Sequence, residues 1–182
     1  MNPYQCFSEL RPSKKIVAKL LKGKEFESVL EVGHQWGENL VAIREKFPDK
    51  KIVGIDLDWD NILQEAKTVT GLDLRKGNVY ELPFKDKEFD VVFTNALFCM
   101  LPPDAIERGF KEIVRVAKKY IILVELNTDD FVGISWGDRS GANWINMFKK
   151  YGLKVTEEKI PREIWEVNPW LSRGYIYYAK KD

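Results

Sequence analysis

The sequence contains two cysteines and one histidine among its 182 residues. Cys6 and Cys99 show neither a metal-ligand spacing nor a disulfide framework, and a single histidine leaves little for a zinc site. No apolar run is long enough for a membrane span, and the start, MNPYQCFSELRPSKK, lacks the hydrophobic region of a secretory signal. These absences predict a cytoplasmic protein that binds no metal and does not enter a membrane.

An excess of either charge is also missing. Lys and Arg number 29 and Asp and Glu number 28, so the formal net charge is +1. A balanced chain has no global field that attracts nucleic acid or acidic lipids, and we expect neither as a partner. The length fits one domain with a real core, which we place at 1–182, as a monomer or homodimer.

Short β-branched runs alternate with helix-like stretches over most of the chain. The runs predict strands at 28–32, 51–55, 72–75, 89–95 and 120–126. The other stretches predict helices at 11–24, 38–47, 61–69 and 104–118. After Leu126 the pattern changes to a polar loop at 127–142, a helix at 143–151 and two strand-like runs at 153–160 and 174–181. The order indicates a parallel α/β sheet that ends in an antiparallel hairpin.

The stretch SVLEVGHQWGENL, from Ser28 to Leu40, predicts a strand, a glycine-containing turn and a helix. Backbone N–H groups at such a helix start can bind a polar ligand. The dinucleotide fingerprint requires G-x-G-x-x-G, but Glu38 stands where the last glycine is needed. A carboxylate at Glu31 would also repel a diphosphate. Both features disfavour NAD and favour a cationic, phosphate-free cofactor such as S-adenosylmethionine, unless Glu31 is an ordinary strand-end residue.

Asp56 ends the second predicted strand in VGIDLD, 23 positions after Gly33. An acidic residue about 20 positions after the glycine turn commonly accepts hydrogen bonds from ribose hydroxyls in such folds. Leu57 would then lie on the adenine face. Asp58 and Asp60 are competitors, and Asp56 could instead cap the following helix.

Four segments together resemble a known family. EVGxxxG, GID, the stretch GNVYELPFKDKEFDVV and the later EIVRVAKKYIILVE resemble the class I S-adenosylmethionine-dependent methyltransferases, specifically the small type 11 methylase domain. The resemblance covers about residues 28–126, and there is a weaker likeness to methylases of nonulosonic-acid sugar biosynthesis. It implies a Rossmann-like three-layer α/β/α sandwich whose mostly parallel seven-stranded sheet has an antiparallel last strand, in the order 3-2-1-4-5-7-6. Residues 1–26 would precede this cofactor-binding core as a helical segment, and 127–182 would form the acceptor side.

The resemblance also implies roles for individual residues. Those expected to contact S-adenosylmethionine are Glu31, Gly33, His34, Gly37, Asp56, Leu57, Asn78, Val79 and Asn95. Asn78 stands where the family often has Asp beside the adenine amino group, and its amide oxygen can still accept from that amine. The sequence TNALF at Asn95 differs from the N-P-P-[YF] signature of base and amide N-methylases. Gln35 replaces the middle glycine of the loop, which requires a left-handed backbone that Gly adopts more freely.

The acceptor side is expected in the loop after Leu126. Trp136, Asp138, Arg139 and Trp144 combine flat apolar surface with charge, and Arg139 could pair with a carboxylate or phosphate of the acceptor. Alternatively, this segment is a surface loop with Trp144 in the core. Trp165 and Trp170 are expected to pack the link between the last two strands, and Cys99 is expected to be a buried thiol.

These features predict an S-adenosylmethionine-dependent methyltransferase that acts on a small molecule, with oxygen of a sugar or metabolite as the acceptor atom. His34, Asp138 and Glu125 are the candidates for a catalytic base, and an imidazole titrates near about 6.5. His34 could equally be a packing or hydrogen-bonding residue. The alternative function is an inactive domain of the same fold that serves as a binding or regulatory partner, which the unusual Gln35 suggests.

Overall fold

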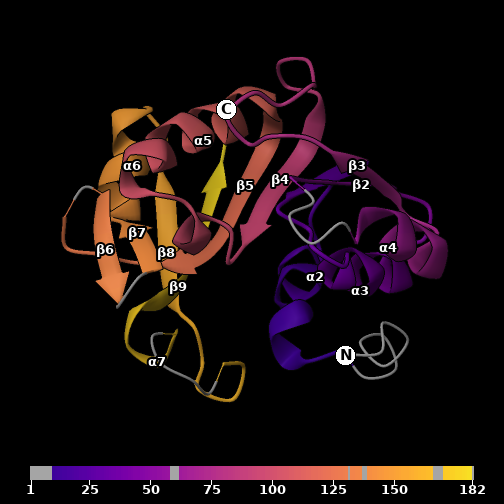
Figure 1. Ribbon diagram of the computed structural model, residues 1–182, viewed down its shortest axis with the longest axis horizontal. Helices are drawn as coiled ribbons and strands as arrows, with labels where there is room; N and C mark the ends of the chain where they lie inside the picture. Colours follow the sequence, from indigo (N-terminus) through magenta and orange to yellow (C-terminus); the bar gives the residue numbers. More distant parts are fainter. Residues whose placement is uncertain (1–9, 58–61, 131, 137–138, 166–169, 182) are drawn as a thin grey trace.

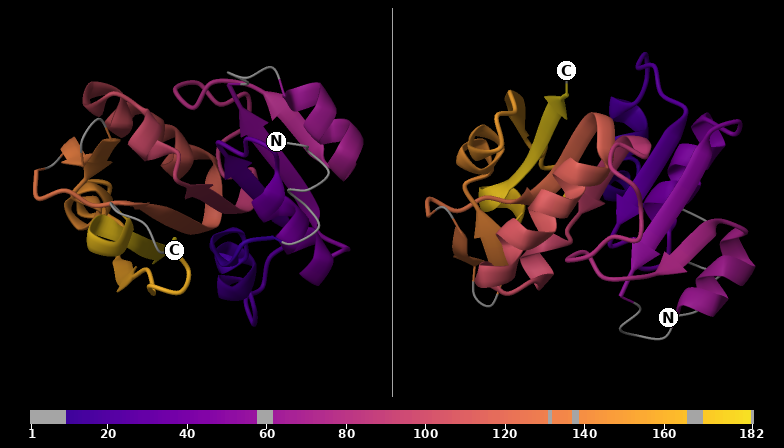
Figure 2. Two further views of the ribbon diagram at one scale, coloured as in Figure 1. Left: turned by 60° about the horizontal axis from the view of Figure 1, so that its bottom comes forward. Right: turned by 90° about the horizontal axis from the view of Figure 1, so that it is seen from above.

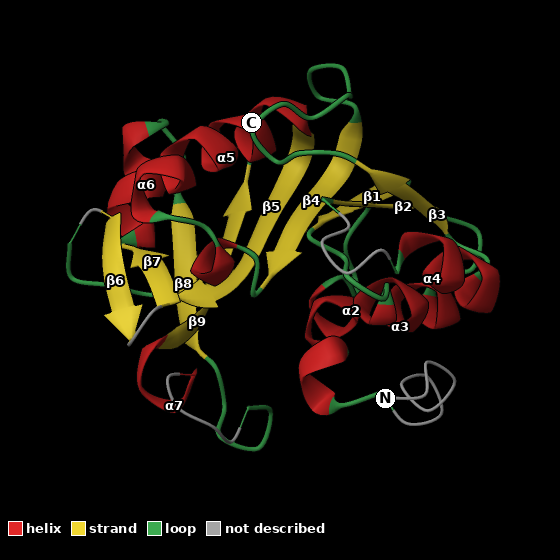
Figure 3. Ribbon diagram, viewed as in Figure 1, coloured by secondary structure: helices red, strands yellow, loops and turns green. Residues whose placement is uncertain are grey.

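A computed structural model describes residues 10–57, 62–130, 132–136, 139–165 and 170–181. These residues form a seven-stranded sheet with helices on both faces, and a separate two-stranded hairpin (Figures 1 and 3). The strands of the large sheet are β1 (Ser28–Val32), β2 (Lys51–Asp56), β3 (Asp73–Lys76), β4 (Phe89–Asn95), β5 (Ala117–Leu126), β8 (Val155–Lys159) and β9 (Gly174–Lys180). Their order is β3-β2-β1-β4-β5-β9-β8, and β9 runs in the opposite direction to the other strands of the sheet. The predicted fold and strand order are confirmed.

Alternating side chains of the central strands supply two hydrophobic cores, one on each face. Val91 and Phe93 pack in one cluster with residues of α2 (Ile16–Leu20), α3 (Glu38–Lys46) and α4 (Leu63–Thr70). Val92, between them, packs in the other cluster with α5 (Pro103–Val116) and α6 (Trp144–Lys150). Successive strand residues point to opposite faces, so a strand that is buried on both faces needs an apolar run. Figure 2 shows the two helical layers on either side of the sheet.

The helix predicted at 11–24 is wrong as a continuous element. A 3-10 turn, η1 (Pro12–Lys14), precedes the short α2, and the chain turns at Gly23 with φ of 76°. The break coincides with a tertiary contact, because the Ser13 carbonyl accepts a hydrogen bond from Asn95 Nδ2 at 3.1 Å. No helix of the described residues is both long enough and apolar enough to cross a membrane.

The polar loop predicted at 127–142 is also wrong in part. It contains the antiparallel hairpin β6 (Val132–Trp136) and β7 (Arg139–Ala142). Ala142 is fully buried beside the end of β5, where its carbonyl accepts from Thr128 N at 3.2 Å. The segment that follows β5 thus pairs with Ala142 of β7. This pairing stabilises a hairpin that the polar composition of the segment does not indicate.

Trp144 joins the hairpin region to the core. Its side chain is fully buried against Phe98 and Phe110, and its Nε1 donates to Leu126 O at 2.9 Å. An indole N–H needs such a partner when it is buried. Of the two alternatives for Trp144, the structure therefore supports the core position, and the residue fixes α6 to the carboxyl end of β5.

Candidate functional site

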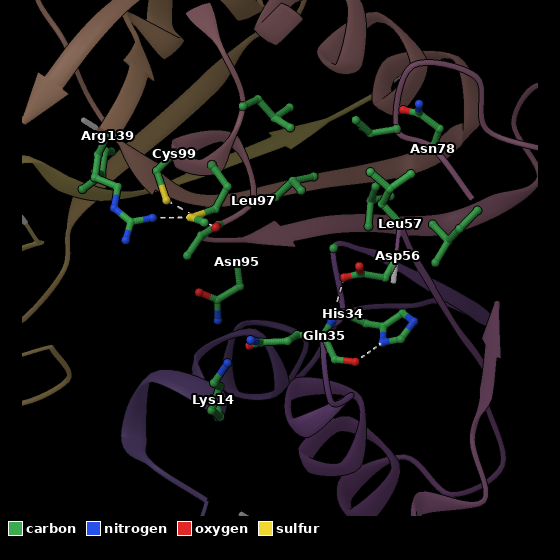
Figure 4. Close-up of a pocket in the computed structure, with 18 of the residues that line it drawn as sticks. Lys14, His34, Gln35, Asp56, Leu57, Asn78, Asn95, Leu97, Cys99 and Arg139 are labelled. Atoms are coloured by element: carbon green, nitrogen blue, oxygen red, sulfur yellow. Dashed lines mark hydrogen bonds between the residues drawn. The ribbon is translucent and has the colours of Figure 1, made fainter. Parts of the chain in front are cut away.

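A cavity of ≈ 1010 Å³ opens at the carboxyl ends of the parallel strands (Figure 4). It lies where the strand order reverses between β1 and β4, which is the usual ligand-binding position in open α/β sheets. The predicted ligand-binding residues that line it are Gly33, His34, Asp56, Leu57, Asn78, Val79, Asn95 and Arg139. Its volume is at the upper end of the range for small-molecule pockets, about 300–1,000 Å³, so a large cofactor and a second small molecule can fit.

The loop between β1 and α3 contains three left-handed residues, of which Gly33 and Gln35 line the cavity. Gly33, Gln35 and Gly37 have φ angles of 83°, 49° and 80°. A Cβ on Gly33 would lie 2.8 Å from Leu97 Cδ1, so glycine is required there by space as well as by backbone angle. Gly37 caps α3 and does not line the cavity. The loop is therefore closely packed against Leu97, just after the end of β4. At Gly33 it presents backbone without a side chain to the cavity.

Asp56 ends β2 beside this loop. Its Oδ2 accepts a hydrogen bond from Gln35 N at 2.9 Å. In a diphosphate-binding loop, backbone N–H groups point at ligand oxygens; here one of them points at a carboxylate of the protein. Leu57 follows with 38% of its surface exposed at the cavity. Asp58 and Asp60, the competitors of Asp56, lie outside the described residues.

Glu31 lies behind the cavity wall and not on it. Its side chain is fully buried, its Oε1 accepts from Asn39 Nδ2 at 2.5 Å, and its Oε2 has no hydrogen-bond partner among the described residues. Burial raises the pKa of Glu31 to about 8, against the lowering effect of nearby Lys14. Glu31 does not line the cavity in this structure and is hydrogen-bonded to Asn39, so its contact with a ligand stays a prediction.

Asn39 continues a chain of buried amides toward the cavity. Asn95 Nδ2 donates to Asn39 Oδ1 at 3.0 Å and to Ser13 O at 3.1 Å. The Oδ1 atom of Asn95 is buried and has no partner among the described residues, although Asn95 lines the cavity. A buried amide oxygen without a donor is costly, so the position suits a ligand that donates a hydrogen bond, as an ammonium group does.

His34 is buried with its ring against β2. A Cβ on Gly54 would lie 2.8 Å from His34 Cδ2, so Gly54 makes the room for the ring. The Nδ1 atom lies 2.9 Å from Gln35 O. Both contacts orient the imidazole at the loop, next to Asp56, which is a packing and hydrogen-bonding position; a catalytic role for His34 stays a prediction.

Asn78 and Val79 stand at the same end of the cavity as Asp56. Asn78 Oδ1 accepts from Tyr80 N at 3.0 Å, so in this structure the amide oxygen stabilises its own turn. Val79 is buried with its side chain against Gly109, where an added Cβ would lie 3.2 Å from Val79 Cγ2. Contact of either residue with an adenine ring remains a prediction.

Arg139 lines the opposite end of the cavity. It begins β7, and its guanidinium donates to Met100 Sδ (Figure 4). The side chain of Trp136 lies outside the described part of the chain, as does Asp138. Among the described residues proposed for the acceptor side, Arg139 lines the cavity and Trp144 lies in the core.

Two further candidates are buried and engaged in structure. Burial raises the pKa of the Cys99 thiol to about 12, which agrees with the predicted buried thiol. Glu125 is fully buried and accepts from Thr94 Oγ1 at 2.8 Å, Leu97 N at 2.9 Å and Phe98 N at 3.1 Å. Burial raises the pKa of Glu125 to about 7. Because its oxygens hold the turn after β4, Glu125 is a structural carboxyl group and not part of the cavity lining.

Sequence reasoning missed several lining residues. These are Arg11, which precedes η1, Ser13 and Lys14 in η1, and Trp165 and Trp170 from the link between β8 and β9. The two tryptophans were expected to pack this link, and they do stack on each other with ring centroids 3.9 Å apart. No local pattern brings these segments to the cavity, because both reach it through contacts between residues far apart in the chain.

Comparison with known proteins identifies the family of this fold. A family model described as a methyltransferase domain matches residues 29–120. An uncharacterised protein of Haemophilus influenzae is 33% identical over 122 residues, which make up 61% of this chain and 48% of that protein. A demethylmenaquinone methyltransferase of Chlorobaculum tepidum is 30% identical over 100 residues, 55% of this chain and 40% of that protein. The alignments thus span less than half of either relative.

A solved structure supports the same fold. The 1,6-didemethyltoxoflavin-N1-methyltransferase of Burkholderia thailandensis, crystallised with 1,6-didemethyltoxoflavin and S-adenosylhomocysteine, superimposes with a TM-score of 0.63. The match covers 99% of this chain and 81% of that one, at 16% identity. Identity at this level supports the architecture and leaves the substrate open.

The backbone angle of Gln35 gives a first prediction. A left-handed residue other than glycine is strained by about 1 kcal/mol, so we expect Gln35→Gly to raise the free energy of unfolding by up to about that amount. Gln64→Gly, in the exposed face of helix α4, is the matched control and should lower it by about 1 kcal/mol. Urea denaturation of both variants measures the difference. Destabilisation by both substitutions would contradict the account of the loop.

The buried carboxyl group of Glu31 gives a second prediction. Its folded-state pKa of about 8 lies above the value near about 4.3 of an unfolded chain, so the folded protein keeps a proton that the unfolded protein loses. The contribution of Glu31 to stability is therefore complete at acidic pH and is lost as pH rises toward 8, by up to about 1.4 kcal/mol per pH unit.

Glu31→Gln cannot ionise, so its stability relative to the wild type should increase between pH 5 and 8 by on the order of 2–4 kcal/mol. Chemical denaturation at both pH values measures this change. Glu163→Gln, which removes an exposed carboxylate, serves as the control and should show no comparable change. A pH-independent difference between Glu31→Gln and the wild type would show that Glu31 does not hold a proton in the folded state.

Proposed function

Because the chain belongs to the class I S-adenosylmethionine-dependent methyltransferases, we propose that it binds S-adenosylmethionine across Gly33 and Asp56 and methylates a small molecule. The relatives named above act on a demethylated quinone and on a toxoflavin precursor, according to their names. Neither acceptor transfers to this chain, since the matched regions are partial or of low identity. Oxygen of a sugar or metabolite remains the proposed acceptor atom.

The position of the Asp56 carboxylate is the observation that carries the proposal. It lines the cavity next to the β1–α3 loop and accepts the Gln35 N–H. A diphosphate would find that N–H engaged by the protein, whereas ribose hydroxyls donate to a carboxylate readily. The donor and acceptor set thus suits an adenosyl ligand without phosphates better than NAD.

The other residues around the cavity have complementary tasks. Gly33 presents backbone without a side chain where the methionine part would lie, and the buried Asn95 Oδ1 offers an acceptor for an ammonium group. Leu57 offers an exposed apolar face for adenine. S-adenosylmethionine supplies an activated methyl group whose leaving group is a neutral thioether, so the protein contributes mainly alignment of the reactants.

Titration calorimetry tests the proposal. S-adenosylhomocysteine should bind the full chain, and Asp56→Asn should weaken binding by roughly 10–100-fold, because hydrogen bonds to a charged group contribute about 1.5–3 kcal/mol. Asp49→Asn, at an exposed turn, is the matched control and should bind as the wild type does. NADH should not bind at millimolar concentration.

Two outcomes separate the alternatives. Absence of S-adenosylhomocysteine binding at millimolar concentration, or binding unaffected by Asp56→Asn, would overturn the proposed cofactor site. Cofactor binding together with no methyl transfer from radiolabelled S-adenosylmethionine to a panel of alcohols, carboxylates, amines and thiols would favour the second candidate, an inactive domain that serves as a binding or regulatory partner.

A further inference from the structure

The cavity extends along the carboxyl ends of four neighbouring strands, from β2 to β5. Its lining includes Asp56, the last residue of β2, and Leu126, the last residue of β5. Three strand steps separate β2 from β5, which at about 4.8 Å each places these two ends about 14 Å apart. Figure 4 shows Asp56 and Cys99 on opposite sides of Asn95. Since the β2 end suits an adenosyl group, the β5 end is where a methyl acceptor would bind, and we call it the acceptor end.

Apolar side chains gather at the acceptor end. They come from the turn after β4, the end of β5 and the link between β8 and β9, and they include Leu97, Met100, Leu101, Leu126, Trp165 and Trp170. Such a wall gives binding free energy to a ligand that removes apolar surface from water. A sugar would bring hydroxyl groups against it, and a hydroxyl that is buried without a hydrogen-bond partner is costly. The acceptor end therefore favours a ligand with an apolar body over a sugar.

Met100 is exposed at the cavity. Among the described residues, the large hydrophobic side chains that stay exposed are Leu57, at 38%, and Met100, at 65%, and both line the cavity. Exposed apolar side chains that gather at a cavity mark a surface which a ligand covers. Met100 ends the 3-10 turn η2 (Phe98–Met100), and Arg139 Nη1 donates to its Sδ, so the guanidinium is engaged within the protein and holds the thioether in place. A thioether makes favourable contacts with aromatic rings.

Trp165 and Trp170 add a flat aromatic wall to the acceptor end. Their ring centroids lie 3.9 Å apart with an interplanar angle of 6°, and both residues line the cavity. Trp170 begins α7 (Trp170–Arg173), and a Cβ on Gly174 would lie 2.6 Å from Trp170 O, so the glycine allows α7 to pack closely on the start of β9. Gly174 pairs with Leu126, which fixes this helix at the carboxyl end of β5. The tryptophan pair is thus a preorganised surface that suits a planar ring.

We propose that the methyl acceptor is a planar aromatic compound, bound at the acceptor end with Met100 and the Trp165–Trp170 pair as its apolar walls. This inference rests on the proposed methyltransferase function and adds the class of acceptor. It distinguishes this cavity from one that takes a sugar, whose hydroxyl groups would meet apolar walls, or a saturated compound of the same size, which cannot stack on an indole ring. A hydroxyl group on the aromatic ring keeps oxygen as the acceptor atom.

Titration calorimetry of matched probes with the full chain tests the inference, with and without saturating S-adenosylhomocysteine. The probes are 2-naphthol, decahydro-2-naphthol, which keeps the carbon skeleton and the hydroxyl group without a planar ring, and methyl β-glucoside. We expect 2-naphthol to bind at least about fivefold more tightly than decahydro-2-naphthol, because ring stacking and sulfur contacts act in addition to the burial of apolar area. The glucoside should bind more weakly than either.

Variants assign the preference to the residues. Trp165→Leu should reduce the ratio of 2-naphthol to decahydro-2-naphthol affinity to below about twofold, while the affinity for S-adenosylhomocysteine stays unchanged. Met100→Gln changes an exposed position, keeps an acceptor for Arg139 and should weaken 2-naphthol binding by at least about twofold, so it tests the inference even if Trp165→Leu fails to fold. Tyr120→Leu is the matched control, because it removes a ring from another stacked pair, with Tyr178 at 5.8 Å, that does not line the cavity. It should bind all three probes as the wild type does.

The outcomes are distinguishable from failure of the proposed function. The inference would be overturned by 2-naphthol binding no more tightly than decahydro-2-naphthol or the glucoside, or by no binding of 2-naphthol at millimolar concentration. A ratio unchanged in a folded Trp165→Leu, or a 2-naphthol affinity unchanged in Met100→Gln, would also overturn it. Absence of S-adenosylhomocysteine binding together with an intact, Trp165-dependent preference for 2-naphthol would instead refute the methyltransferase function and leave the aromatic site standing.

Discussion

The hydrogen bond from Gln35 N to the Asp56 carboxylate is the interaction on which the candidate site depends. It joins the loop after β1 to the end of β2, two strands that pair in parallel along their length. Gly33 N donates to Ile55 O at 2.8 Å just beside it, so two backbone donors of the loop face β2. These two N–H groups of the loop therefore donate to acceptors of the protein, Asp56 Oδ2 and Ile55 O. Beside the loop, the cavity presents the Asp56 carboxylate to a ligand. This contact is the basis of the proposal that Asp56 binds a ribose and that the loop does not bind a diphosphate.

Two buried carboxyl groups support that arrangement from behind. Glu31 on β1 reaches the cavity through Asn39 and Asn95, and Glu125 on β5 fixes the turn that carries Leu97. Burial raises the pKa values of both carboxyl groups toward neutral, to about 8 and about 7. Stability is therefore linked to pH through residues that do not line the cavity. The linkage follows from placing acidic side chains inside a sheet that is buried on both faces.

The sheet could be predicted from the sequence because its signal is local: apolar runs, alternating helices and glycines at turns. Asp56 and Gly33 could be placed for the same reason, since a fixed spacing after a strand brings them together at one sheet edge. The position of Glu31 was not predictable, because an acidic residue one step before a strand's end points to either face with similar sequence context. The contributions of Lys14 and Trp165 depend on packing between distant segments, and no local periodicity encodes such contacts.

The most direct test is a crystal structure of the full chain with S-adenosylhomocysteine. The account predicts the ligand across the β1–α3 loop, with a ribose hydroxyl within about 3.2 Å of an Asp56 carboxylate oxygen and the adenine beside Leu57. The sulfur should face Asn95, toward the end of the cavity that Arg139 lines. A ligand bound elsewhere, or one in this cavity that makes no contact with Asp56, would contradict the central claim.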